Sequence, residues 1–84
     1  MHVLHKQFME KLFTANIDID RQSVAYNIVF ENEKYTFIPE ARNPGASSFS
    51  FMRENDEWHE QQEIDTALKK QALDVLENYL LSQH

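Results

Sequence analysis

The chain contains no cysteine, one glycine and two prolines in 84 residues, and none of its apolar runs exceeds three residues. Without cysteine it cannot form a disulfide, use a thiolate nucleophile or bind zinc through sulfur. A single glycine excludes glycine-rich phosphate-binding loops and the nucleophile elbow, because both need several glycines for close backbone approach. A membrane span needs roughly twenty apolar residues. We therefore expect a soluble, cytoplasmic protein that does not enter the membrane.

Positive charge is also scarce, since eight Lys and Arg residues face fourteen Asp and Glu residues and leave a formal net charge of −6. A chain of this charge repels polyanions, so we expect no nucleic-acid partner. Ten aromatic residues supply bulk for one modest core. A chain of this length buries only about 60–65% of its unfolded surface, which indicates a single domain over residues 1–84.

Hydrophobic spacing near the N-terminus predicts a helix over residues 3–14. Leu4, Phe8 and Leu12 are four residues apart, which places them on one stripe of a helix. The period ends before Asn16, a residue that suits a helix C-terminus. Residues 16–20 alternate polar and apolar side chains over too short a stretch to indicate a strand, so we expect a loop there.

Alternation of period two predicts two strands, over residues 24–31 and 34–38, joined by a turn at Asn32-Glu33. A two-residue turn fixes the register of the hairpin. The predicted pairs are Phe30 with Tyr35, Ile28 with Phe37, and Glu31 with Lys34.

A third strand is predicted over residues 48–54, where Phe49 and Phe51 alternate with polar residues. Pro39 ends the strand before it, and a loop containing Pro44 and Gly45 connects the two. Helical spacing returns over residues 63–81 and predicts the longest helix. The expected fold is therefore α+β, in the order helix, strand, strand, strand, helix. It is a three-stranded antiparallel sheet with both helices packed on one face.

This order of elements is similar to that of the double-stranded-RNA-binding domain. The last helix of that domain begins beside a cluster of basic residues, and Lys69 and Lys70 resemble such a cluster here. That family meets phosphates with small and basic residues before the helix. Here residues 54–65 contain six carboxylates instead. The resemblance implies a shared topology only, because fold does not fix function.

The second face of the predicted sheet offers a candidate interaction surface, because it is neither strongly charged nor strongly apolar. Such a surface suits a second copy of the chain or another protein, although an ordinary solvated face is the plainer interpretation. Its candidate binding residues are Asn27, Val29, Thr36, Ile38, Ser50 and Met52.

The polar segment of residues 53–60 is the other candidate, because Trp58 could stack on a ligand and His59 could pair with a carboxylate for acid–base chemistry. In the plainer interpretation Trp58 covers the edge of the core. The four histidines show no spacing typical of a metal site. We assign no catalytic residue, metal or cofactor.

Three hypotheses for function follow from the sequence. The first is a non-catalytic interaction module that acts through the open sheet face or an edge strand and pairs with itself or with another protein. The second is a small-ligand-binding domain near Trp58, and the third is an enzyme that uses His59 with a carboxylate. The sequence favours them in that order.

Overall fold

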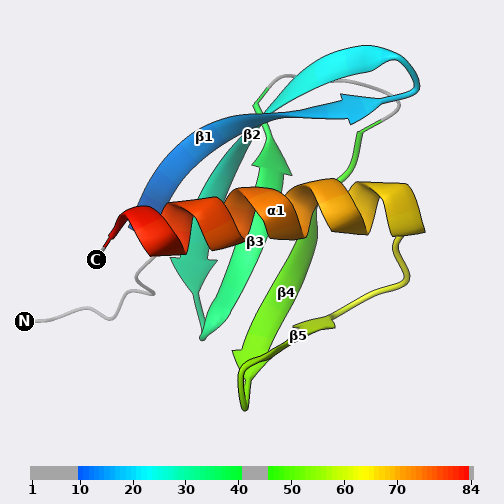
Figure 1. Cartoon of the computed structure of the whole chain (residues 1–84). Helices are drawn as coiled ribbons and strands as arrows, with labels where there is room; N and C mark the ends of the chain where they lie inside the picture. The colour runs from blue at the N-terminus through cyan, green and yellow to red at the C-terminus, as the bar shows by residue number, and fades with distance from the viewer. Residues whose placement is uncertain (1–9, 41–45, 84) are drawn as a thin grey trace, which may run out of the picture.

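The computed structural model describes residues 10–40 and 46–83 of the chain, which form a five-stranded antiparallel sheet and one helix (Figure 1). The strands follow one another in sequence order across the sheet, each paired with the next. Their bounds are β1 Glu10–Ile19, β2 Gln22–Glu31, β3 Lys34–Pro39, β4 Phe49–Glu54 and β5 Glu57–Glu60, followed by α1 Thr66–Ser82.

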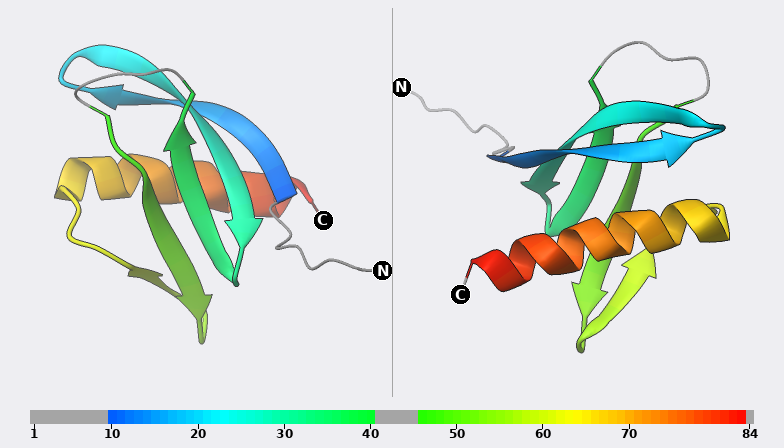
Figure 2. Two further views of the ribbon diagram at one scale, coloured as in Figure 1. Left: turned by 180° about the vertical axis from the view of Figure 1, so that it is seen from behind. Right: turned by 45° about the horizontal axis from the view of Figure 1, so that its top comes forward.

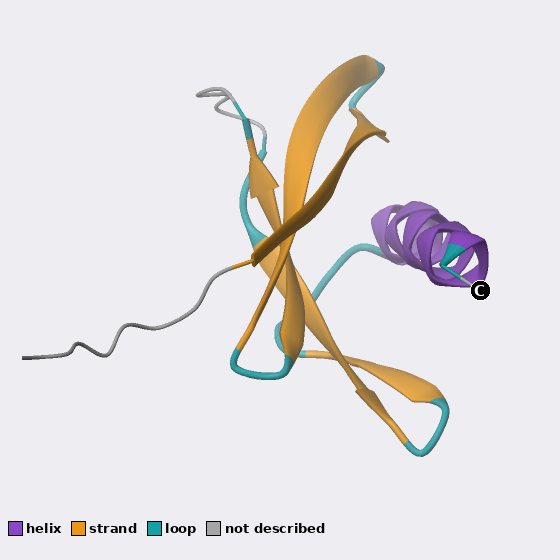
Figure 3. Cartoon of the chain, turned by 90° about the vertical axis from the view of Figure 1, so that its left-hand side faces the viewer, coloured by secondary structure: helices purple, strands orange, loops and turns teal. Residues whose placement is uncertain are grey.

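The helix α1 lies across one face of the sheet, and β1 is the strand closest to it (Figure 2). On the opposite face no helix or strand of the described chain is present (Figure 3). We call these the inner and the outer face. An antiparallel sheet tolerates this arrangement, because side chains along a strand alternate between a buried and a solvated side.

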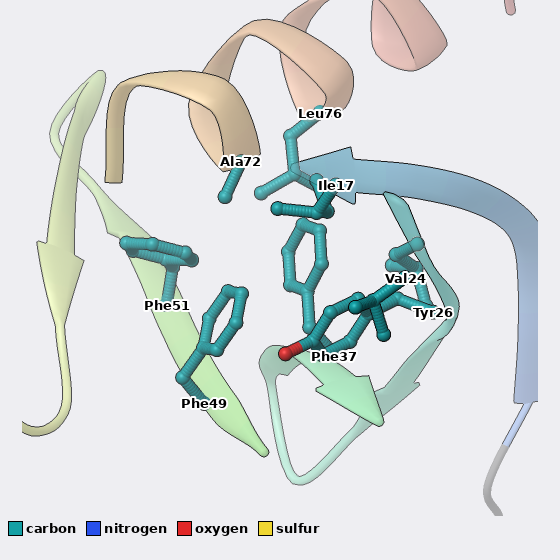
Figure 4. Close-up of a cluster of buried hydrophobic side chains, with 9 residues drawn as sticks. Ile17, Val24, Tyr26, Phe37, Phe49, Phe51, Ala72 and Leu76 are labelled. Atoms are coloured by element: carbon teal, nitrogen blue, oxygen red, sulfur yellow. The ribbon is translucent and has the colours of Figure 1, made fainter. Parts of the chain in front are cut away.

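Four of the nine buried residues that form the core on the inner face are aromatic (Figure 4). Tyr26, Phe37 and Phe51 are fully buried, and Phe37 stacks on Phe49 with 4.8 Å between the ring centroids. The helix contributes Ala72 and Leu76, both fully buried. These two residues are four apart, so they share the helix face that packs on the sheet.

Three two-residue turns connect the hairpins, and all six turn residues have positive φ, from 49° to 68°. Positive φ at both positions gives the type I′ turn, whose twist matches that of the flanking strands. None of the six is glycine. The turns are Asp20-Arg21, Asn32-Glu33 and Asn55-Asp56.

The predicted hairpin around Asn32-Glu33 is confirmed in its register, because Phe30 pairs with Tyr35 and Ile28 with Phe37. Glu31 lies opposite Lys34, also as predicted. The last predicted helix is confirmed as α1. It begins after Asp65, whose side chain accepts hydrogen bonds from the backbone N–H groups of Ala67 and Leu68.

The predicted first helix is wrong for the part that the structure describes, because residues 10–14 belong to β1. Residues 3–9 of that prediction lie outside the described residues. The register of β1 against β2 shifts between Lys11 and Phe13, which marks a β-bulge at Leu12. A bulge breaks the period of two, so Leu12 and Phe13 both pack against the core. Because Leu12 and Phe13 are adjacent and both apolar, their spacing favoured a helix over a strand.

The loop predicted over residues 16–20 is also wrong, because β1 continues to Ile19 and only Asp20 lies in the turn. The sheet has five strands instead of three, with β1 and β5 added at its two edges. Among the described residues one helix, α1, covers the inner face instead of two. Without the order helix, strand, strand, strand, helix, the topological likeness to the double-stranded-RNA-binding domain no longer holds.

Candidate functional site

Six of the predicted binding residues lie together on the outer face, in three adjacent strands. They alternate with core residues along β2, β3 and β4. Val29 pairs with Thr36, which pairs in turn with Ser50, so these three form one row across the sheet. Asn27 pairs with Ile38 in the next row. We keep the term outer-face patch for Asn27, Val29, Thr36, Ile38, Ser50 and Met52.

The outer-face patch is uncharged, and charged residues border it at the end near the β2–β3 and β4–β5 turns, whereas Thr14 and Ala25 at its other end are uncharged. Lys11 lies beside Val29 in the neighbouring strand, and Met52 pairs with His59 on the other side. Val29 is only 5% exposed, while the other five are partly exposed. The charged residues that border the patch on this face are Lys11, Glu31, Lys34, Glu54 and Glu57.

One side-chain hydrogen bond orders the margin of the patch. Thr14 in β1 donates from Oγ1 to Oδ1 of Asn27 in β2 over 3.0 Å. The two residues are directly opposed. The bond links β1 to the patch and fixes the side chain of Asn27.

Trp58 lies on the inner side of the sheet, separated from the outer-face patch. Its Nε1 donates to Oε2 of Glu77 in α1 over 2.8 Å, and the Arg53 guanidinium lies 4.7 Å from the indole centroid. The ring also packs edge-on against Tyr35 and Phe51. The indole thus joins β5 to α1 at the margin of the core, and its surroundings are already occupied by protein groups.

The contacts of Trp58 also affect a carboxylate. The hydrogen bond from Trp58, and to a lesser degree that from Arg53, lowers the pKa of Glu77 below its ordinary value. Nearby, the Lys69 ammonium lies 3.0 Å from Oε1 of Glu60 and lowers the pKa of that carboxyl. Both carboxylates are therefore held ionised by structural contacts between α1 and the sheet, and neither is poised as a general acid near neutral pH.

His59 lies on the outer face, because it is adjacent to Trp58 along β5 and side chains alternate. Its Nε2 is 3.9 Å from Glu54 and 3.8 Å from Glu57, beyond hydrogen-bond distance. All three side chains are about half exposed or more. The structure therefore does not combine Trp58 and His59 into one site.

A hollow of about 390 Å³ lies elsewhere, between the β1–β2 turn and the start of α1. Three carboxylates border it, from Asp18, Asp20 and Asp65. The Asp65 carboxylate already caps α1. Across the described ranges, no three His, Cys, Asp or Glu side chains are placed to hold a metal ion.

Two glutamines form contacts that the sequence analysis missed. The side-chain amide of Gln71 accepts from the backbone N–H of Asp18 and donates to its C=O, both over 2.9 Å. Gln62 makes the same pair of bonds to Ser50, over 3.0 and 3.4 Å. Each amide replaces the peptide group of a neighbouring strand. No local pattern identifies such residues, because Gln71 and Asp18 are 53 positions apart.

Within the described residues, no helix has both the length and the apolar character needed to cross a membrane. A scan against protein-family models and searches of curated proteins and of solved structures found no match.

Proposed function

We propose that this chain is a non-catalytic interaction module that associates with a second copy of itself through the outer-face patch. The observation that carries the proposal is an uncharged patch, bordered by charged residues at one end and by mostly polar, uncharged residues at the other, on a sheet face that no described helix or strand covers. This is the anatomy of a small protein interface, in which a core depleted of charge is enclosed by a polar rim.

The edges of the sheet are less suited to association than its outer face. At one edge, Gln71 already occupies the backbone groups of Asp18 in β1. At the other edge, β5 is only four residues long and carries two glutamates. Short and charged edge strands disfavour pairing with another chain. We therefore propose the outer face, and not an edge, as the surface of association.

Ligand binding and catalysis receive less support from the geometry. A stacking site would need an open face on Trp58, but Arg53 lies over the indole. Acid–base catalysis would need His59 in a cleft with a carboxylate within hydrogen-bond distance, and both carboxylates near it are farther away. Neither hypothesis has a specific observation in its favour.

A second copy is the partner that we propose, because the rim of the patch carries both signs of charge. Lys11 and Lys34 lie on the same face as Glu31, Glu54 and Glu57. A two-fold axis brings unlike parts of one surface together, so a mixed rim can complement itself. The patch consists of six residues, whereas a standard interface contains roughly 20–30 residues of each partner. We therefore expect a weak, concentration-dependent dimer.

Light scattering across a range of protein concentrations tests the proposal on the full chain and on Met52→Glu. We expect the mass of the parent chain to rise towards twice the monomer mass, and Met52→Glu to remain monomeric. The new carboxylate would have to be buried in the interface, where an unpaired charge costs several kcal/mol.

Leu81→Glu is the matched control, because Leu81 lies on α1, is 68% exposed, and gives the same change of charge. We expect this variant to dimerise like the parent. Circular dichroism establishes that both variants are folded. A parent chain that stays monomeric at the highest concentration, or a Met52→Glu variant that still dimerises, would refute self-association through this patch.

A further inference from the structure

The backbone of β1 presents hydrogen-bonding groups away from the sheet. Ile19 pairs with Gln22 across the two-residue turn, so these two residues exchange hydrogen bonds. Because the pattern alternates, the N–H and C=O groups of Thr14, Asn16 and Asp18 point away from β2. We call these three pairs of groups the β1 edge.

The Gln71 amide shows that the β1 edge accepts a peptide-like partner. Its oxygen and nitrogen bind the N–H and C=O of Asp18, both over 2.9 Å. This is the pairing that a residue of a sixth strand would make. For Thr14 and Asn16, no described residue bonds to the outward backbone groups.

The helix α1 runs alongside β1 in the opposite direction and contacts it at two separated points (Figure 2). Gln71, near the start of the helix, meets Asp18, and Tyr79, near its end, stacks on Phe13 with centroids 4.4 Å apart. The first contact is to the backbone edge itself. The helix therefore closes one end of the β1 edge through Gln71, and the contact between Tyr79 and Phe13 holds the helix over the inner face.

We infer that β1 carries a latent strand-addition site, that Gln71 of α1 is the residue that closes one end of it at Asp18, and that the strand that pairs there is β1 of a second copy. Uncovered edges are templates for pairing with another chain. The β1 edge is separate from the outer-face patch, so this inference does not depend on the proposed function.

The sequence of β1 suits antiparallel pairing with itself. In the register that places Thr14 opposite Asn16 of the second copy, each of these residues can exchange two backbone hydrogen bonds with its partner. Their side chains, on the outer face, are uncharged. Asp18 then lies near the bulge at Leu12 of the second copy, so no carboxylate of β1 stands opposite it.

The inference is tested with Gln71→Ala in the full chain by amide hydrogen exchange and sedimentation velocity. The substitution removes both bonds to Asp18, so we expect the Asp18 N–H to exchange about tenfold faster. We also expect species heavier than the parent chain at the same concentration. Gln71→Glu keeps an acceptor for the Asp18 N–H and loses the donor, so its effect should be intermediate.

Two further variants separate edge pairing from other causes. Asn16→Pro removes an outward N–H that edge pairing requires, and proline is tolerated at such positions of edge strands. We expect Gln71→Ala combined with Asn16→Pro to return to the mass of the parent. Repeating the pair of variants in the Met52→Glu background separates the β1 edge from the outer-face patch.

Three results would overturn the inference. One is unchanged exchange at Asp18 in Gln71→Ala, and another is faster exchange without any gain in mass. The third is a gain in mass that persists when Asn16→Pro is added. If circular dichroism shows that Gln71→Ala is unfolded, Gln71→Glu is judged by the same three criteria. Glutamate is closer in shape to glutamine and still removes the hydrogen-bond donor.

Discussion

At the scale of single residues, Tyr26 is a polar group placed inside an apolar core. Its side chain is fully buried, and its hydroxyl donates to the backbone C=O of Ser47 over 3.1 Å. Burial disfavours the phenolate and raises the pKa of Tyr26 above its ordinary value of 10.0. The hydroxyl thus ties the start of β4 to the core without introducing charge.

The raised pKa predicts a loss of stability in alkaline solution. Above pH 10 the unfolded chain releases the Tyr26 proton while the folded chain retains it, so the free energy of unfolding falls as pH rises through this range. Tyr26→Phe should be about 1 kcal/mol less stable at neutral pH, because it loses the bond to Ser47. Its stability should then decline less with pH. Urea unfolding between about pH 8 and 11 measures both effects.

Tyr79→Phe provides the control for this series, because it removes a hydroxyl from a partly buried tyrosine at the surface of α1. We expect it to be as stable as the parent chain at neutral pH, where Tyr26→Phe loses about 1 kcal/mol. Equal slopes for the parent and for Tyr26→Phe would show that Tyr26 ionises as readily in the folded chain as in the unfolded one.

At the scale of elements, the sequence predicted what is local and failed where distant contacts decide. The hairpin of β2 and β3 and the helix α1 follow from uninterrupted periods and from their own turn and capping residues. The strand β1 contains a bulge at Leu12, which breaks the period of two, so its apolar residues were interpreted as the stripe of a helix. The strand β5 has four residues, which are too few for alternation to distinguish a strand from a charged loop.

The turn of the predicted hairpin suggests a stabilising substitution, Glu33→Gly. Glu33 has a φ of 62°, in the left-handed region where a side chain costs about 1–2 kcal/mol. Glycine removes this cost but gains freedom in the unfolded chain worth about 0.5–1 kcal/mol. We expect a net gain in the free energy of unfolding of about 0.5–1 kcal/mol, measured by urea unfolding.

Glu33→Ala is the matched control, since it removes the same charge and keeps the Cβ atom. This variant should not be stabilised. If alanine stabilises the chain as much as glycine does, the gain comes from the lost carboxylate near Glu31 and not from the backbone of the turn.

At the scale of the whole molecule, the sequence predicted which side chains share a sheet face better than it predicted the fold around them. Alternation alone placed Val29, Thr36 and Met52 on one face, because that inference needs only the local period of each strand. It could not place Trp58 and His59 on opposite faces, since the strand β5 was not recognised. The bonds of Gln71 and Gln62 to strand backbones depend on chain packing and leave no pattern in the sequence.

The net charge of the chain predicts how its self-association depends on salt. Two copies of formal charge −6 repel each other over their whole surfaces. Exposed ion pairs at the rim contribute only about 0–1 kcal/mol each. The screening length shortens from about 20 Å at 0.02 M salt to about 6 Å at 0.3 M. We therefore expect the dimer dissociation constant, measured by sedimentation equilibrium, to fall as salt is raised over this range.

The substitution Asp74→Lys tests whether overall repulsion is the cause, because Asp74 is exposed on α1, away from the outer-face patch. It changes the formal net charge from −6 to −4 without altering the patch. The dissociation constant of this variant should be lower at 0.02 M salt and should vary less with salt. A parent dimer that weakens as salt rises would instead mean that attraction between rim charges outweighs the repulsion between the two chains.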